Sequence, residues 1–293
     1  MGMNRVKELY DNLTQIDDLP AFPAIAFEVI RLTRDPNTTS KHLEEVIKKD
    51  PNLVSQILKI ANSSLYGLSR EVTSLNHAIN LLGFVQVENI VMISVILSSV
   101  KKLPLHKNFN RDKFLEHCFG CGVTAKIIAN ILNFNFSSAE FSGGVIHDIG
   151  KVLLDLYAPE SLDEILEHAY KNGMSFIDAE MELYGINHSM LGAKLLSIWG
   201  LPEEIIDIVE YHHKPLKAKN KLLVSVVHVA DLLTYSKGIG FGGNYAKFIL
   251  EEDEGWRLLI EEAKLQEEFD IAFFTFKLYE EIDNAKQLYF ERS

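Results

Sequence analysis

The stretch Gly143-Gly144-Val145-Ile146-His147-Asp148-Ile149-Gly150-Lys151 places an adjacent histidine and aspartate inside an apolar, helix-like run. Burial of an imidazole and a carboxylate is costly unless each group is paired or bound to a metal. A divalent cation is the first candidate for the compensating partner. His147 and Asp148 are therefore the first candidate ligands, although an adjacent pair by itself fits a purely structural role equally well.

Helical periodicity extends from this stretch in both directions. The predicted helices span 24–34, 40–49, 51–62, 73–82 and 85–100, and later 111–132, 137–157 and 187–199. Asp50 and Pro51 provide an N-cap and a proline at the first helical position. No segment has a convincing strand pattern, so the sequence predicts an all-α fold.

The best internal boundary is the connector Lys101-Lys102-Leu103-Pro104, because its beginning is charged and its proline would end a helix. We therefore expect an N-terminal helical subdomain at residues 1–104. A second helical subdomain is expected at residues 105–293, and it ends in acidic helices.

The charge of the chain limits the partners that it can have. Its 293 residues include 29 Lys and Arg against 41 Asp and Glu, a net charge of −12. Such a charge repels phosphate backbones at long range, so nucleic acid is not expected as a partner. Binding through the lysines at 41, 48, 49 and 59 is a weaker alternative, because interleaved acidic residues make that segment look like a solvated mixed-charge face.

The sequence predicts no membrane association. The uncharged apolar run Ile90–Val100 falls well short of the roughly 18 residues that span a bilayer. The first six residues lack an apolar signal core. A cytoplasmic location is the resulting expectation.

Cys118 and Cys121 form a single C-x-x-C. Half of a zinc site and a redox pair are both open interpretations, but no second cysteine pair and no thioredoxin-like pattern accompany it. Two small residues on a buried helix explain the motif more simply.

Further metal-type residues occur at wide intervals around His147 and Asp148. His117 is expected in the middle of a helix, His188 at the start of one, His212 and His213 at the end of one, and Asp231 one turn beyond His228. Imidazole and carboxylate groups suit iron, manganese, zinc or nickel, and a carboxylate can bridge two ions. A site with one or two divalent transition-metal ions is therefore expected if these side chains meet in space.

In this order, the motifs resemble the HD superfamily of metal-dependent phosphohydrolases and, more narrowly, the HDOD family, an HD-related output domain of bacterial signalling proteins. The similar segments are Leu19-Pro20-Ala21-Phe22-Pro23, the tract from Asp50 through Ser63-Ser64-Leu65-Tyr66-Gly67, Ala78–Gly83, His117, His147–Lys151, Asn187–Leu196, Trp199–Pro202, His212-His213 and Asp231. They cover about residues 19–235.

The resemblance implies an N-terminal helical bundle packed against an HD-type helical bundle. It also implies that the chain keeps the set of ligands that would hold two metals in HD-GYP phosphodiesterases. In this chain the set is His117, His147, Asp148, His188, His212, His213 and Asp231. By the same resemblance, Lys151 would lie beside the substrate phosphate. The chain departs from those enzymes after His213, where Lys214-Pro215 stands in place of an acidic residue and a Gly-Tyr-Pro segment.

Two functional classes remain. The favoured one is a regulatory signalling module with a structural or sensory metal and a protein partner. The alternative is a phosphohydrolase acting on a nucleotide or another phosphate-containing small molecule, in which divalent ions would activate water and polarise a phosphoryl oxygen. Only in that case would Asp148 and Lys151 be catalytic, the lysine by offsetting charge on the phosphate.

Overall fold

The computed structural model describes residues 5–16, 19, 23–33, 35–62, 71–104, 106, 109–239, 245–265, 276, 279 and 280. Every regular element within these residues is helical, which confirms the all-α prediction. Residues 20–22 and 63–67, which contributed to the family resemblance, lie outside this description.

The chain divides into two compact units. The small unit comprises Pro20–Lys102, and the large unit comprises Met1–Leu19 together with Leu103–Ser293. The first residues, which were expected in the N-terminal subdomain, group with the large unit in the structure. Contacts explain this grouping, because the Lys194 ammonium lies 4.3 Å from the ring centroid of Tyr10.

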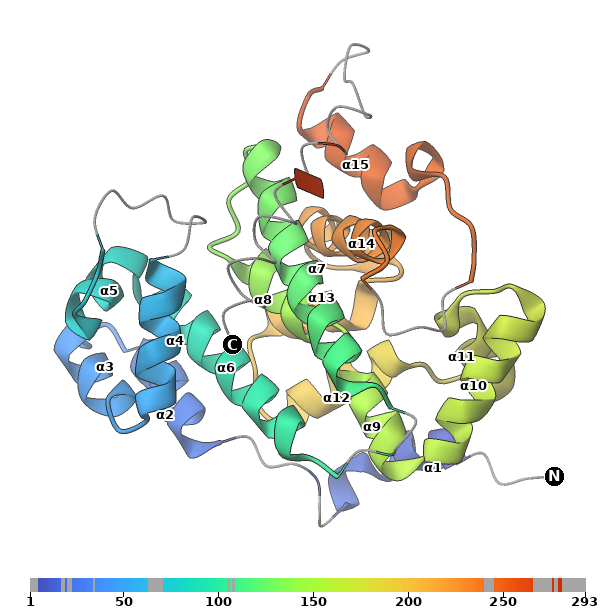
Figure 1. Cartoon of the computed structure of the whole chain (residues 1–293), viewed down its shortest axis with the longest axis horizontal. Coiled ribbons are helices and arrows are strands. Elements are labelled where there is room, and N and C mark those ends of the chain that lie inside the picture. Colours follow the sequence, from blue (N-terminus) through green and yellow to red (C-terminus); the bar gives the residue numbers. More distant parts are fainter. Residues whose placement is uncertain are drawn as a thin grey trace. The chain divides into compact units, whose positions relative to one another are not determined.

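The described residues of the small unit form five helices. They are α2 (Ala24–Thr33), α3 (Ser40–Ile47), α4 (Pro51–Ala61), α5 (Leu75–Leu82) and α6 (Phe84–Lys102), in blue to cyan in Figure 1. The predicted cap of α4 is present, since the Asp50 carboxylate accepts bonds from the backbone N–H groups of Asn52 and Leu53. The core of this unit includes fully buried Leu43, Ile57 and Ile79.

Helix α6 is the one described helix whose length and composition would allow it to cross a membrane. That evidence is weak, because the core helix of a soluble protein passes the same test. More than half of the apolar stretch is buried. Val87, Ile90, Val91 and Val95 of α6 belong to the core of the small unit.

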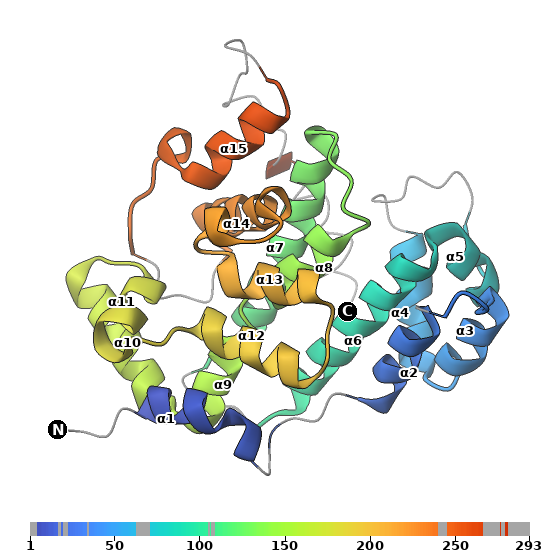
Figure 2. The same ribbon diagram turned by 180° about the vertical axis from the view of Figure 1, so that it is seen from behind.

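The large unit contains α1 and the later helices. They are α1 (Arg5–Asn12), α7 (Arg111–Ile131), α8 (Ala139–Ile146), α9 (Ile149–Tyr157), α10 (Pro159–Asn172), α11 (Phe176–Tyr184), α12 (His188–Ile198), α13 (Glu203–Tyr211), α14 (Lys221–Ser236) and α15 (Glu254–Glu262), with short 3-10 turns η1 (Leu13–Gln15), η3 (Pro215–Lys217) and η4 (Leu250–Glu252). Helix α7 packs on α8 and α14, α9 packs on α12, and α15 lies beside α14, as Figures 1 and 2 show from opposite sides.

One predicted helix is divided in two. The sequence predicted a continuous helix over 137–157, whereas α8 ends at Ile146 and α9 begins at Ile149. Asp148, with φ −94° and ψ 9°, occupies the N-cap position of α9. His147 and Asp148 therefore lie at a turn between two helices, where both can point into the interior.

Candidate metal centre

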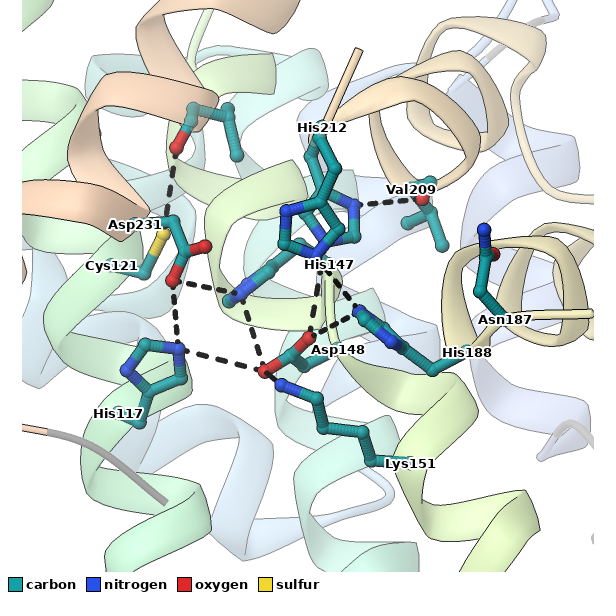
Figure 3. A network of polar contacts seen from close by, with 12 residues as sticks. His117, Cys121, His147, Asp148, Lys151, Asn187, His188, Val209, His212 and Asp231 are labelled. Carbon is teal, nitrogen blue, oxygen red and sulfur yellow. Dashed lines mark hydrogen bonds and ion pairs between the residues drawn. The ribbon is translucent and has the colours of Figure 1, made fainter. Parts of the chain in front are cut away.

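The seven candidate ligands come from five separate places in the large unit. His117 lies in α7, His147 and Asp148 between α8 and α9, His188 at the first position of α12, His212 and His213 directly after α13, and Asp231 in α14. Their side chains meet in one polar cluster, shown in Figure 3 for all but His213. All are buried except His213, which is partly buried.

Glycines allow the helices that carry these residues to approach closely. A Cβ atom on Gly150 would collide with the carbonyl oxygen of His188, so α9 and α12 are in backbone contact there. A Cβ atom on Gly144 would lie 2.7 Å from the Cα of Gly122, so the backbones of α8 and α7 are also in contact and leave no room for a side chain there. These two contacts bring the ligands of the four helices within reach of one another.

Asp148 occupies the middle of the cluster, between two groups of imidazoles. Its Oδ1 lies 3.1 Å from Nε2 of His188 and 3.9 Å from Nε2 of His212. Its Oδ2 lies 3.4 Å from Nε2 of His147 and 3.6 Å from Nε2 of His117. One carboxylate therefore faces both groups, an arrangement suited to bridging two ions.

Asp231 and His213 complete the two groups. Oδ1 of Asp231 lies 3.1 Å from Nε2 of His117 and 3.6 Å from Nε2 of His147. Nε2 of His213 lies 3.1 Å from Nε2 of His188. The ligand atoms of His117, His147 and Asp148 form one compact set within 4.8 Å, and those of the other three histidines form a second.

Four of these histidines form a hydrogen bond through Nδ1 to an acceptor in the protein. Nδ1 of His147 lies 2.7 Å from the carbonyl oxygen of Gly144, and Nδ1 of His212 lies 2.8 Å from that of Val209. The corresponding partner of His117 is the carbonyl of Ile239, at 3.0 Å. A carbonyl only accepts hydrogen bonds, so each Nδ1 carries a proton and each Nε2 can offer a lone pair to the cluster.

Glu180, which is not among the site residues predicted from the sequence, accepts the corresponding bond from Nδ1 of His188. Its Oε2 lies 2.6 Å from Nδ1 of His188, and its Oε1 accepts the backbone N–H of the same residue at 2.8 Å. The Glu180 side chain is fully buried. A carboxylate behind a ligating imidazole fixes its orientation and raises its basicity. Nothing in the local sequence marks Glu180, because the contact depends on how α11 and α12 fold against each other.

Several atoms of the cluster are buried without a hydrogen-bond partner. These atoms are Nε2 of His147, Nε2 of His212 and Oδ1 of Asp148. An unpartnered buried polar atom is costly and rare in proteins. The His147 atom belongs to one ligand group and the His212 atom to the other, with Asp148 between them, so divalent cations bound by the two groups would satisfy these atoms. The residues present therefore fit a metal ion.

The charges of the cluster are strongly coupled. Burial alone would raise the pKa of Asp148, but His147 and Lys151 beside it hold that pKa well below its usual range. Burial, followed by repulsion from His147 and His188, lowers the pKa of His212 well below its ordinary value. Burial, with His212 and His188 next to it, has the same effect on the pKa of His213. For His147, burial alone would lower the pKa, but the Asp148 carboxylate raises it well above its ordinary value. Neutral imidazoles and an ionised carboxylate are the forms that bind metals, so metal binding would release a proton from His147.

A pocket leads to one side of the cluster. It has a volume of about 260 Å³, and His117, Lys151, His213 and Asp231 contribute to its lining. The remaining lining is formed by Ser175, Phe176, Ile177, Asp178, Met181, Lys214, Leu232, Tyr235, Ala246 and Phe248. The ammonium of Lys151 lies 2.6 Å from Oδ2 of Asp148 and 4.9 Å from the ring centroid of Phe176. A small ligand in the pocket could therefore contact both the cluster and Lys151.

Cys118 and Cys121 are both free and buried in α7. Burial raises the pKa of both thiols. A raised pKa disfavours the thiolate that redox chemistry and metal ligation require. The C-x-x-C motif is therefore accounted for by two small residues in the helix interior.

Comparison with known proteins agrees with this architecture. The structure is similar to that of an HDOD domain protein of unknown function from Geobacter sulfurreducens, with a TM-score of 0.77, 23% identity and coverage of 98% of both chains. A candidate phosphohydrolase from Shewanella amazonensis has a TM-score of 0.67 and 21% identity, with coverage of 94% of this chain and 97% of that one. A candidate signal transduction protein from Marinobacter aquaeolei has a TM-score of 0.65 and 20% identity, with coverage of 98% and 60%. At these identities the likeness concerns the fold.

A curated relative from Treponema pallidum, of uncharacterised function, is 24% identical over 221 residues. The match covers 74% of this chain but only 42% of the relative's length. The family profile described as HDOD domain matches residues 19–215, which include all the candidate ligands except Asp231. Because this match covers more than half of the chain, the chain belongs to the HDOD family.

Proposed function

We propose that this chain is a signalling output module whose large unit binds one or two divalent transition-metal ions, of iron, manganese, zinc or nickel type, and that a protein partner reads the state of the module. The observation that carries the metal proposal is the set of unpartnered buried atoms on His147, Asp148 and His212. Family membership supports the signalling role.

Each residue of the cluster has a distinct task in this proposal. The five histidines and two aspartates would hold the ions, with Asp148 between the two ligand groups. The ions, when bound, would supply positive charge that attracts a phosphoryl oxygen and activates water. Lys151 offsets the charge of Asp148 and presents its ammonium to the pocket.

A metal-dependent phosphohydrolase is the second candidate function. The observation that favours it is the pocket, because a phosphoester of small size could reach the cluster and Lys151 together. Lys214, which follows the two histidines where HD-GYP enzymes are acidic, also lines this pocket. An added cation in that place favours a phosphate group as the ligand.

Metal content is the first test of the proposal. Elemental analysis of the purified protein, before and after reconstitution with Mn²⁺, Fe²⁺ or Zn²⁺, should find close to stoichiometric metal. D148A and H147A should lose it, while H77A, at an exposed histidine of the small unit, should not. A wild-type protein that retains no metal after reconstitution would refute the proposal.

Hydrolysis of phosphoesters separates the two candidate functions. Nucleotides, cyclic dinucleotides and generic phosphomonoesters are offered to the metal-loaded protein, and release of product is measured. Turnover that disappears in D148A and in K151M, but persists in the control K194M, would establish the enzyme. Binding of inorganic phosphate without turnover, weakened in K151M by about tenfold or more, would favour the regulatory module, since a charge-assisted hydrogen bond contributes roughly 1.5–3 kcal/mol.

A further inference from the structure

A buried histidine outside the candidate ligand set joins the cluster to a distant part of the chain. His228 lies in α14, three residues before Asp231. Its Nδ1 is 2.6 Å from the carbonyl oxygen of His212, and its Nε2 is 2.8 Å from Oδ2 of Asp253. The side chains of His228 and Asp253 are only 10% and 16% exposed. Because a carbonyl and a carboxylate both accept hydrogen bonds, both nitrogens of the ring donate, and the bonds are charge-assisted.

The carbonyl that His228 binds belongs to the peptide joining two candidate ligands. Helix α13 ends at Tyr211, and carbonyl groups at a helix C-terminus lack partners within the helix. His228 supplies the missing donor for His212. The peptide group is planar, so fixing its oxygen fixes the orientation of the plane from which His212 and His213 both project.

Asp253 uses its two carboxylate oxygens for two different segments. Oδ1 accepts the backbone N–H of Trp256 at 2.8 Å and so caps α15, while Oδ2 accepts the bond from His228. A Cβ atom on Gly255 would lie 2.8 Å from Cδ2 of His228, so a glycine is needed for the first turn of α15 to lie against the imidazole. The first turn of α15 therefore packs directly against His228, and its N-cap residue Asp253 is bonded to the same imidazole.

The segment that precedes Asp253 borders the pocket. Ala246 and Phe248 contribute to the pocket lining. The N–H of Tyr245 donates to the carbonyl of Met174 at 3.1 Å, and the ring of Tyr245 contacts that of Tyr170 with centroids 5.4 Å apart. Residues 245–253 therefore pass from the end of α10, along the pocket, to His228.

We infer that His228 and Asp253 are positioning residues of the metal centre: they hold the backbone of His212 and His213 in place and connect it to α15. The inference rests on the proposed metal function, because it concerns ligands of that centre. It assigns a role to the acidic C-terminal region around Asp253 that the charge of this region alone does not suggest.

The first experiment separates the bond to His228 from the cap of α15. D253S retains a hydroxyl that can cap α15 but is too short to reach His228 as well. D50S makes the same change at the cap of α4, in the small unit. Titration with Co²⁺ against a competing chelator should show an affinity about 10–100-fold weaker in D253S, the usual effect of losing a partner that supports a ligand, and unchanged in D50S.

A second pair of variants identifies the atom that matters. The side-chain amide of H228N lies near the place of Nδ1 and can still donate to the His212 carbonyl, whereas H228L has no donor. Metal affinity should therefore decrease in the order wild type, H228N, H228L, and the Co²⁺ absorption bands, which report ligand geometry, should change most in H228L. Equal affinities and identical spectra in all three proteins would overturn the inference.

Amide hydrogen exchange tests the same link in metal-free protein. Exchange at residues 212–214 should be faster in D253S and H228L than in wild type and D50S. Unchanged exchange there would overturn the inference whether or not the wild type binds metal. Failure of the wild type to bind any metal would instead refute the proposed function, and accelerated exchange would still support the positioning of this backbone by His228.

Discussion

The histidines of the cluster are oriented by partners of two kinds. For His147 and His212 the partner is the carbonyl three residues earlier, Gly144 and Val209, so the end of one helix is sufficient to orient the ring. For His117 and His188 the partner comes from elsewhere in the chain, in the second case Glu180. The orientation of those two rings depends on tertiary packing.

Glu180 is expected to support metal binding through His188. In E180Q the amide can replace one of the two hydrogen bonds but not both, and it lacks the negative charge. Affinity for Co²⁺ or Mn²⁺ should fall by about 10–100-fold. E182Q, on the same helix at an exposed position, is the matched control. Equal affinities in E180Q and E182Q would show that the carboxylate behind His188 is dispensable.

At the level of elements, the positions of five of the seven candidate ligands follow from where a helix begins or ends, while His117 and Asp231 lie within α7 and α14. Asn187 caps α12 through the N–H of Met190, which places His188 at the first position of that helix. Asp148 precedes α9 and His212 follows α13. Helix ends leave backbone groups unpaired and side chains free to turn inward. The cluster is therefore an assembly of helix termini around α7 and α14.

Close packing of α9 on α12 is expected to be essential for the cluster. G150A adds a methyl group that would collide with the carbonyl oxygen of His188, so it should destabilise the large unit by about 1–3 kcal/mol or more. Urea unfolding followed by tryptophan fluorescence measures this, because the two tryptophans, Trp199 and Trp256, are both in the large unit.

The matched control is G173A, at a glycine with φ +61° where an added Cβ would meet no atom within 4 Å. This substitution should lower the free energy of unfolding only through backbone strain, by about 1–2 kcal/mol. Metal affinity should decrease in G150A, because separation of α9 from α12 moves Asp148 away from His188. An equal metal affinity in both variants would contradict this account of the packing.

At the level of the whole molecule, the candidate ligands all belong to one unit. The large unit contains every residue of the cluster as well as His228 and Asp253, while the small unit has its own apolar core. Binding to a folded state stabilises that state by mass action. Metal is therefore expected to act on the stability of one unit selectively.

Metal at about 100 times its dissociation constant should stabilise the large unit by about 2.7 kcal/mol. The tryptophan unfolding transition should move to higher urea concentration, and a chelator should reverse the shift. Amide exchange should slow in α7, α9, α12 and α14 but remain unchanged in α3, α4 and α5. Equal protection of both units would refute a site confined to the large unit.

The helical class, several helix caps and the residue types of the candidate centre can all be predicted from the sequence. These properties depend on local features such as apolar periodicity, Asp50-Pro51 and the histidines near helix ends, which act within a few residues. Residue type and spacing along the chain made the histidines and aspartates candidate ligands, and the family resemblance implied that seven of them form one two-metal set.

Long-range packing accounts for the break between α8 and α9, the grouping of the first residues with the large unit, and the contacts of Glu180, His228 and Asp253. The contacts responsible join residues far apart in the chain, such as His228 with Asp253 and Gly150 with His188. No local pattern encodes such a pair, because its free energy is gained only when whole helices pack together and exclude water.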